Sequence, residues 1–178
     1  MSKTNNFVFK GLKIVTWIIF IGLCIEAVSL IVNFIFNLYN PELVQNQYQK
    51  LDLSDMYEQN KGAFFSMYTF IFIISTLKAL LFYVVIKLVS KINLSKPFNR
   101  LVSRLISIIS YFTLLIGLIS FSARHTAKNL ELHGYNIDML STFWTDSQAF
   151  ILMAAVIYII AVIFSKAVEN QEELEETV

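Results

Sequence analysis

Two charged residues interrupt long apolar stretches of this 178-residue chain, and their positions make them the first candidates for chemistry. Glu26 stands near the middle of an apolar run from Ile14 to Phe36, and Lys78 breaks a second run from about Ala63 to Val89. A carboxylate or an ammonium group inside a membrane costs about 3 kcal/mol on insertion scales, so such groups are usually paired or functional.

The spacing of these two residues predicts that they meet. Glu26 is thirteen residues after Lys13, and Lys78 is thirteen residues before Lys91. At 1.5 Å per residue, each charge lies roughly 20 Å along its helix from a basic residue at the same membrane face. We therefore predict an intramembrane charge pair between Glu26 and Lys78, direct or through one water. Three roles stay open for it: a structural clamp, a proton or ion site, and a regulatory switch.

Other reactive side chains do not form a recognisable site. His125 and His133 are eight residues apart, with Glu131 and Asp138 nearby, whereas zinc motifs on helices space their ligands three or four residues apart. Cys24 has no histidine near it in the sequence, and no glycine-rich phosphate loop is present. We therefore expect no catalytic residues, no metal site, no cofactor and no enzymatic activity.

The composition is that of a membrane protein. Hydrophobic residues make up 56% of the chain and charged residues 15%, which excludes an ordinary soluble domain. Five glycines and two prolines favour long helices and argue against a β-barrel, which needs many turns. The single cysteine cannot form an internal disulfide. The net charge of +1 gives no indication of nucleic-acid binding.

Four stretches reach the roughly 20 apolar residues that a helix needs to cross the hydrocarbon core. They lie at about 12–38, 63–89, 101–121 and 147–167, with outer loops at 39–62 and 122–146, a cytoplasmic turn at 90–100 and a tail at 168–178. We predict an all-α membrane protein: a single domain, residues 1–178, of four transmembrane helices in an antiparallel bundle. The first span outlasts the apolar core of a signal peptide, so we interpret it as an uncleaved anchor.

The distribution of lysine and arginine predicts the orientation. With the N-terminus inside, nine of these residues lie on cytoplasmic segments and four on outer loops. Because cytoplasmic loops carry the excess of positive charge, we predict that both termini are cytoplasmic. Trp17 and Trp144 fall near the predicted interfaces, where indole rings favour the headgroup layer.

The outer loops and the start of the fourth span contain local signals. We expect a short helix with Leu53, Met56 and Tyr57 on one face. We also expect a second short helix that ends near Gly134. A surface cover over the bundle is the expected role of these loops, and a binding loop is the alternative. The sequence Thr145-Asp146-Ser147-Gln148 is typical of a capping box.

Each predicted span also carries a stripe of small or polar residues at helical spacing. Helices in lipid pack through small residues and interhelical hydrogen bonds, so we expect these stripes to face inward. The stripes are Gly22, Glu26, Ser29, Asn33 and Asn37 on the first span; Tyr68, Ser75 and Lys78 on the second; Ser103, Ser107, Ser110, Gly117 and Ser120 on the third; Ala154, Tyr158, Ala161 and Ser165 on the fourth.

Opposite charges gather at the predicted cytoplasmic side. The basic face consists of Lys87, Lys91, Lys96, Arg100 and Arg104, and the acidic tail carries Glu169, Glu172, Glu173, Glu175 and Glu176. The basic residues are suited to anionic lipid headgroups. Acids at a helix C-terminus oppose the helix dipole, so we expect the tail to fray. It either folds back onto the basic face or serves a soluble partner.

Several stretches together resemble a known family. They are IIFIGLCIEAVSLIVNFIFNLYNP, LDLSDMY, LKALLFYVVIKLVSKINLSKPF and IFSKAVENQEELEETV. The chain is similar to a bacterial membrane-protein family catalogued as domain of unknown function 2975. The resemblance implies a bacterial cytoplasmic membrane, no established activity and no catalytic residues. Family members are often encoded beside a small helix-turn-helix regulator, which implies a transcriptional regulator as a partner.

The favoured function is a small non-enzymatic regulatory or accessory protein. It would lie in the lipid bilayer and bind a cytoplasmic partner such as a helix-turn-helix regulator, without binding nucleic acid directly. The alternative is a small transporter or ion-coupled carrier that uses Glu26 and Lys78. Four helices are few for a carrier, so this alternative requires an oligomer.

Overall fold

The computed structural model describes residues 3–39, 51, 53–92, 99–144 and 146–176, and these residues are helical almost throughout. Four helices are long and apolar enough to cross a membrane, which confirms the predicted all-α membrane fold. The elements, in chain order, are α1 (Lys3–Tyr39), α2 (Ser54–Gln59), α3 (Lys61–Lys91), α4 (Arg100–Leu132), the 3₁₀ helix η2 (Asp138–Thr142) and α5 (Ser147–Glu176).

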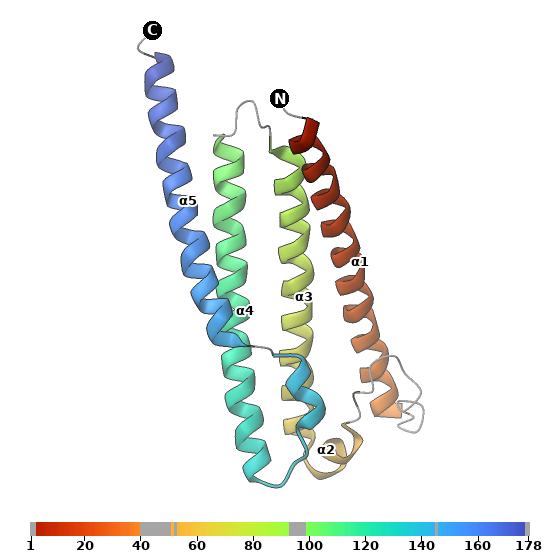
Figure 1. Ribbon diagram of the computed structural model, residues 1–178. Coiled ribbons are helices and arrows are strands. Elements are labelled where there is room, and N and C mark those ends of the chain that lie inside the picture. Colours follow the sequence, from red (N-terminus) through yellow and green to blue (C-terminus); the bar gives the residue numbers. More distant parts are fainter. Residues whose placement is uncertain (1–2, 40–50, 52, 93–98, 145, 177–178) are drawn as a thin grey trace.

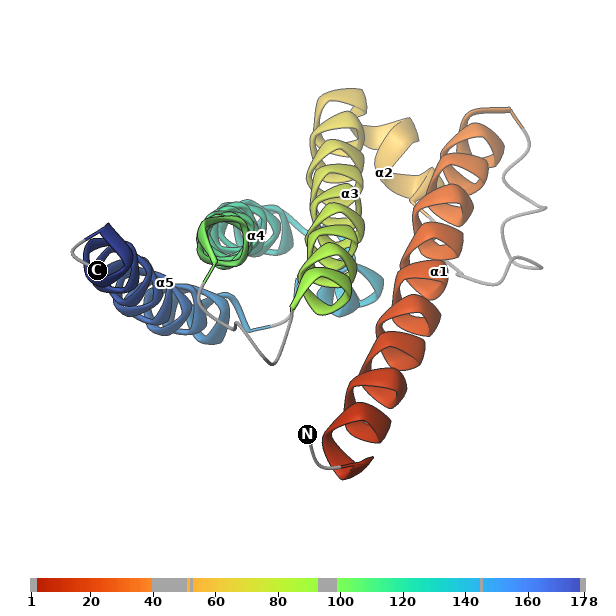
Figure 2. The same ribbon diagram turned by 90° about the horizontal axis from the view of Figure 1, so that it is seen from above.

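The four long helices run antiparallel, and both chain termini lie at the same end of the bundle (Figure 1). We call this end, where α3 stops and α4 starts, the terminal end, and the opposite end the loop end. The main contacts join α1 to α3, α3 to α4, and α4 to α5, so the order in space follows the order in sequence. Viewed from above, the helices form an open row rather than a closed square (Figure 2).

The open row gives the four helices different environments. In the most apolar stretch of α1, 11% of the residues are buried, against 33% for α4. Helices α1 and α5 therefore occupy the edges of the row, and α3 and α4 its centre. Such a row is stable only where the solvent is itself apolar, because lipid chains cover exposed Leu, Ile and Val side chains without loss.

Small residues form the α4–α5 contact. On α5 the buried positions recur every seven residues, at Ser147, Ala154, Ala161 and Val168. A repeat of seven corresponds to 3.5 residues per turn, the period of a coiled-coil seam. Of the predicted stripe, Ala154 and Ala161 are buried on this seam, whereas Tyr158 and Ser165 lie beside it with exposed side chains.

Helix α4 presents the complementary seam, on which Ser103, Ser110 and Gly117 are buried and seven residues apart. The Ser110 hydroxyl donates to the Ala154 carbonyl oxygen at 2.9 Å. A Cβ atom at Gly117 would lie 2.8 Å from Ile151 Cγ1 and 3.1 Å from the Ile151 backbone nitrogen. The absence of a side chain there lets the two helices approach closely, as helices in membranes commonly do.

The second outer segment is largely helical, but not as a separate helix. Helix α4 continues through residues 122–132 and ends at Leu132, two residues before Gly134, whose φ of 88° suits glycine. The chain then returns along α3 through η2, so that α5 begins partway along α4 (Figure 1). Of the predicted capping box, Thr145 lies outside the described residues. Asp146 accepts from the Ala149 backbone N–H at 3.5 Å.

The main hydrophobic core lies at the loop end. Phe64 and Met67 of α3 are fully buried there, and Leu140 of η2 packs in the same cluster. The short helix predicted to carry Leu53, Met56 and Tyr57 on one face is present as α2. Leu53 directly precedes it, Leu53 and Met56 join the core, and Tyr57 packs against that core.

Trp144 belongs to this core as well, with 7% of its surface exposed, whereas Trp17 is 45% exposed. The sequence predicts Trp144 in the headgroup layer, but its side chain packs within the protein core instead. The segment that carries it folds back against α3, and the sequence alone does not indicate this return.

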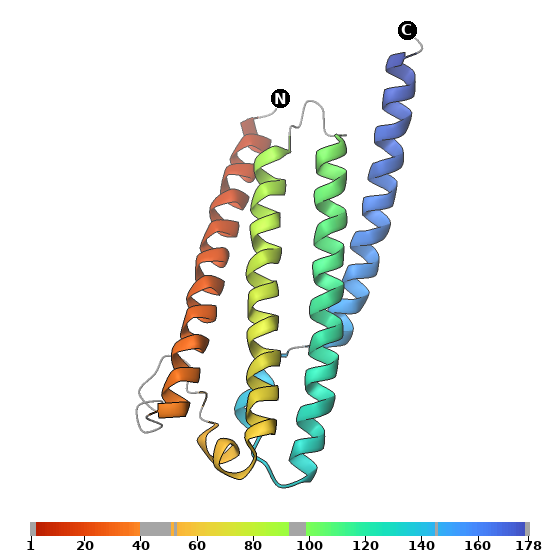
Figure 3. The same ribbon diagram turned by 180° about the vertical axis from the view of Figure 1, so that it is seen from behind.

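Helix α5 does not fray where the sequence predicts it. The helix continues through the acidic tail to Glu176 and extends beyond the terminal ends of α3 and α4 (Figure 1, Figure 3). Val168 is buried against the bundle, and Glu172 forms an ion pair with Arg100. These two contacts offset the unfavourable interaction of glutamates with the C-terminal end of the helix dipole.

Candidate functional site

The two intramembrane charges lie on facing helices but have different partners. The side chains of Glu26 on α1 and Lys78 on α3 are both half-buried. The Ser75 hydroxyl donates to Glu26 Oε1 at 3.2 Å, and Lys78 Nζ donates to the Phe143 carbonyl oxygen at 3.4 Å. The described residues include no Glu26–Lys78 ion pair within 4.0 Å. The charge pair that the sequence predicts, direct or through one water, stays a prediction.

The contact of Lys78 with Phe143 shows how far the segment before α5 folds back along α3. Lys78 is seventeen residues beyond Lys61, which is roughly 25 Å along the helix from the loop end. Phe143 and Trp144 are both buried, with 8% and 7% of their surfaces exposed. Irregular backbone at membrane depth is tolerated where protein surrounds it, because its polar groups then find partners. The ammonium group and the carbonyl oxygen satisfy one another.

A second polar cluster surrounds Asn37 near the loop end of α1. The Asn37 amide nitrogen lies 2.8 Å from the Tyr68 hydroxyl, 3.1 Å from the Leu51 carbonyl oxygen and 2.9 Å from the Asn33 carbonyl oxygen, and its two hydrogens are shared among these three acceptors. Its oxygen accepts from the Leu53 backbone N–H at 3.0 Å. One side chain therefore connects α1, α3 and the end of the first loop.

Asn37 appeared in the sequence only as the last member of the α1 stripe. Its buried position agrees with the inward face that the stripe predicts, with 3% of its surface exposed. Its role as an anchor for the loop backbone was missed. Backbone groups are the same at every residue, so the sequence carries no signal for which of them a side chain will bind.

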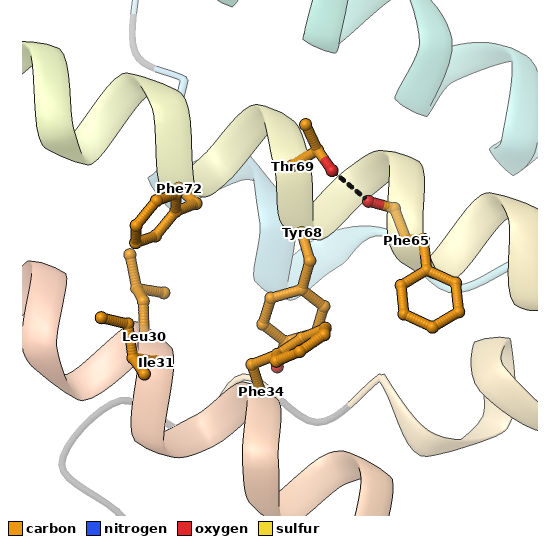
Figure 4. Close-up of a pocket in the computed structure, with 7 residues that line it drawn as sticks. All are labelled: Leu30, Ile31, Phe34, Phe65, Tyr68, Thr69 and Phe72. Carbon is orange, nitrogen blue, oxygen red and sulfur yellow. Dashed lines mark hydrogen bonds between the residues drawn. The ribbon is translucent and has the colours of Figure 1, made fainter.

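An aromatic pocket of about 310 Å³ lies between α1 and α3 (Figure 4). The Phe34 and Tyr68 rings form an edge contact with centroids 5.1 Å apart, and the Phe34 and Phe64 rings stack at 5.9 Å. The Thr69 hydroxyl donates to the Phe65 carbonyl oxygen at 2.7 Å (Figure 4). The pocket walls are Leu30, Ile31, Phe34, Phe65, Tyr68, Thr69 and Phe72. No charged side chain lies among them, so the pocket suits an apolar chain rather than chemistry.

At the terminal end, the structure brings one member of the basic face onto the acidic tail. Arg100 Nη2 lies 2.6 Å from Glu172 Oε2, and Arg100 Nε lies 2.8 Å from Glu172 Oε1. This fork geometry gives two parallel charge-assisted hydrogen bonds between α4 and α5. The two side chains are 79% and 40% exposed, so water screens the pair.

The other members of the two charged sets are spread over the terminal end. Lys87 and Lys91 are exposed at the end of α3, and the Lys87 ammonium lies 4.5 Å from the centre of the Tyr83 ring. Lys96 lies outside the described residues. Glu169 and Glu173 are exposed on α5. Glu175 and Glu176 are helical, and the positions of their side chains are not described.

A polar groove of about 410 Å³ separates the terminal ends of α4 and α5, and we call it the α4–α5 groove. The polar groups around it are Arg100, Ser103, Arg104, Ser107, Ser165 and Glu169. Two of them, Arg100 and Arg104, belong to the basic face, and Glu169 belongs to the acidic tail. The sequence predicts these residues on one side of the membrane but does not predict a groove between them.

Comparison with known proteins gives a single result. Residues 46–178 match the sequence profile of a family described as "Protein of unknown function (DUF2975)". The match covers α2, α3, α4 and α5 and begins after α1, so the first of the stretches that carry the resemblance lies outside it. Neither the curated proteins nor the solved structures contain a match.

Proposed function

Since the chain belongs to the DUF2975 family and carries four helices able to cross a membrane, we propose that it is a regulatory or accessory membrane protein. Its role would be to bind a soluble partner at the terminal end. We further propose that this end is cytoplasmic and that the membrane is the cytoplasmic membrane of a bacterium.

The observation that carries this proposal is the projecting end of α5. The helix reaches Glu176, beyond the terminal ends of its neighbours (Figure 3). Its last two turns expose Glu173 and also Leu174, which is 68% exposed. The Arg100–Glu172 ion pair joins the helix to α4 just before this point. A helix already fixed in position loses less conformational entropy on binding than a disordered tail does.

The chemistry of this surface specifies the partner. A helical end rich in glutamate favours a protein with a basic patch, because complementary potentials accelerate association and determine orientation. The same acidic charge disfavours direct contact with nucleic acid, whose phosphates are negative. A helix-turn-helix regulator, the partner that the family resemblance implies, has a basic surface of this kind.

Substitutions that leave the ion pair intact test the proposal. Deleting residues 168–178 would also remove Val168 and Glu172, which hold α5, so charge neutralisation is the sharper change. In a variant with Glu173, Glu175 and Glu176 all changed to Gln, we expect the candidate regulator to bind at least about tenfold more weakly in detergent. The matched control changes Glu58 and Glu131, at the loop end, to Gln. Equal binding by both variants and the wild type would refute a role for the acidic tail.

Cysteine labelling tests the orientation. In a Cys24→Ala background, single cysteines at positions 55 and 133 should react with an impermeant reagent from outside intact cells. Cysteines at positions 96 and 172 should react only after the membrane is opened. External reaction at position 96 would place the terminal end outside and remove the basis for a cytoplasmic partner.

One observation favours ion-coupled transport as a second candidate function. Glu26 and Lys78 are half-buried within helices long enough to span a membrane, where charged side chains commonly mark ion or proton paths. Ion flux into liposomes would be compared for the wild type, Glu26→Gln, Lys78→Met and the double variant. Loss of flux in a folded double variant favours a transport site. A double-mutant cycle on stability measures whether the two side chains meet.

A further inference from the structure

The α4–α5 groove contains two opposite charges that the described part of the chain leaves unpaired. Arg100 is engaged by Glu172, at 2.6 Å. Arg104 and Glu169 line the same groove, and neither side chain has an ion pair or hydrogen bond among the described residues. The groove therefore offers one guanidinium group and one carboxylate that are both available to a ligand.

A serine hydroxyl also opens into this groove. Ser103 is 7% exposed, and its hydroxyl has no hydrogen-bond partner among the residues that the structure describes. The neighbouring Ser107 donates to the Ser103 carbonyl oxygen at 3.2 Å and so uses its own hydrogen. The Ser103 hydroxyl is accessible from the groove and free to donate, so it suits a ligand with an acceptor oxygen.

The position of the groove favours an anionic acceptor near Ser103. The groove lies over the first two turns of α4, which begins at Arg100. Backbone N–H groups at the start of a helix carry partial positive charge and attract anions such as phosphate. The Arg104 guanidinium adds a full charge and a fork of donors suited to phosphate oxygens.

The surroundings favour a lipid over a soluble phosphate. Leu101, the first apolar residue of α4, is 46% exposed beside Arg100, so apolar surface that suits an acyl chain begins next to the groove. Tyr111 follows Arg104 by seven residues, or two turns, on the same side of α4. Its ring centre lies 6.3 Å from that of Tyr158 on α5. Both rings are about half exposed, so they offer aromatic surface to an acyl chain.

We propose that the α4–α5 groove binds the zwitterionic headgroup of an aminophospholipid. The phosphate contacts Arg104 and the Ser103 hydroxyl, the primary ammonium group contacts Glu169, and an acyl chain follows Tyr111 and Tyr158. An anionic headgroup without an amine would place its phosphate near the Glu169 carboxylate with no compensation. A choline headgroup has no N–H to donate to that carboxylate. The site therefore prefers a headgroup with a primary amine over an anionic headgroup without an amine and over a choline headgroup.

The binding of defined lipids to the full chain in detergent tests this inference. Native mass spectrometry would give the apparent Kd for phosphatidylethanolamine, phosphatidylglycerol and phosphatidylcholine. We expect the wild type to bind phosphatidylethanolamine the most tightly. Arg104→Gln should weaken binding of all three lipids by about tenfold or more, since it removes a charge-assisted hydrogen bond to the phosphate. Glu169→Gln should abolish the preference for ethanolamine over glycerol.

The controls lie on α4 at the loop end, where Arg124→Gln and Glu131→Gln remove the same types of charge from exposed positions. Both should leave lipid affinities within about twofold of the wild type. Thermal unfolding without added lipid shows whether each variant is folded, and Arg104→Lys, which retains the charge, should keep most of the affinity if Arg104→Gln does not fold.

Three results would overturn the proposal. The first is a wild type that binds phosphatidylglycerol or phosphatidylcholine as tightly as phosphatidylethanolamine. The second is an equal loss of lipid in Arg104→Gln and Arg124→Gln, which would indicate general attraction to headgroups. The third comes from soluble competitors. If free phosphoethanolamine displaces the lipid at a concentration similar to its own, the ligand is a soluble zwitterion and not a lipid.

Discussion

The loop end and the terminal end of this bundle are stabilised by different interactions. At the loop end, Phe64 and Met67 are fully buried and aromatic rings pack around them. Asn37 holds the loop backbone there with two hydrogen bonds, to the Leu51 carbonyl oxygen and from the Leu53 N–H. At the terminal end, the contact between α4 and α5 is made by small residues and by an ion pair that is largely exposed.

The two ends therefore differ in role: the loop end stabilises the fold, and the terminal end leaves charged groups accessible to binding partners. Close packing of large side chains and buried hydrogen bonds, each worth about 0.5–1.5 kcal/mol, stabilise the loop end, whereas an exposed ion pair contributes less than about 1 kcal/mol. The loop end therefore carries much of the folding free energy. The terminal end keeps its charged groups exposed, and it is there that we place both the protein partner and the lipid headgroup.

The largest effect is expected from Asn37→Ala. The substitution leaves the Leu53 N–H, the Leu51 carbonyl oxygen and the Tyr68 hydroxyl without this partner in a buried site. Each buried group that loses its hydrogen bond costs about 1–3 kcal/mol, so we expect a loss on the order of 3 kcal/mol. Chemical unfolding in detergent measures it, with the exposed Asn129→Ala as the control. Similar values for the two variants would contradict a special role for the loop end.

Gly117→Ala should be the next most damaging change, because it tests the α4–α5 seam between the two ends. The added methyl group would meet the Ile151 side chain and its backbone nitrogen, which moves only with the helix. We expect a loss of about 1–3 kcal/mol, the usual cost of overpacking. Gly22→Ala on α1 is the matched control, since nothing lies within 4 Å of its Cβ position. Alanine there should be neutral or stabilise the helix by roughly 0.5–1 kcal/mol. An equally neutral Gly117→Ala would mean that α5 packs more loosely than the structure indicates.

Ser75→Ala should have a smaller effect. The hydroxyl of this buried residue donates to Glu26 Oε1 at 3.2 Å, so its removal takes one hydrogen bond from the carboxylate. We expect the free energy of unfolding to fall by about 1–2 kcal/mol, with the half-buried Ser66→Ala on the same helix as the control. If Ser75→Ala and Ser66→Ala lower the free energy of unfolding equally, the Glu26 carboxylate has another partner. The predicted contact with Lys78 is then the first candidate, and a double-mutant cycle tests it.

The smallest effect is expected at the Arg100–Glu172 ion pair. Either Arg100→Gln or Glu172→Gln should lower stability by less than about 1 kcal/mol, and high salt should reduce the difference from the wild type further. Thermal unfolding at low and high ionic strength measures both. A loss as large as that of Asn37→Ala would show that the terminal end is also a stabilising core, and the contrast between the two ends would fail.

Much of the site is visible in the residue types but not in their contacts. Glu26 and Lys78 stand out because charge is rare in apolar runs, and Arg100 and Glu172 because opposite charges gather at one predicted side. The partners Ser75 and the Phe143 carbonyl could not be predicted. One is a common hydroxyl among many, and the other is a backbone group that every residue possesses.

The sequence by itself determined the four spans, their antiparallel order and the inward position of Asn33 and Asn37. These follow from local properties, because each helix in lipid must satisfy its own backbone hydrogen bonds and place its polar residues against protein. Only the tertiary structure decided that the helices form an open row, that residues 135–144 return along α3, and that α4 and α5 leave a groove at the terminal end. In a lipid bilayer, the helix face that contacts lipid and the face that contacts protein are both mainly apolar, so hydrophobicity does not distinguish them. The choice between them depends on close packing of small residues and on backbone hydrogen bonds, for which hydrophobicity carries no signal.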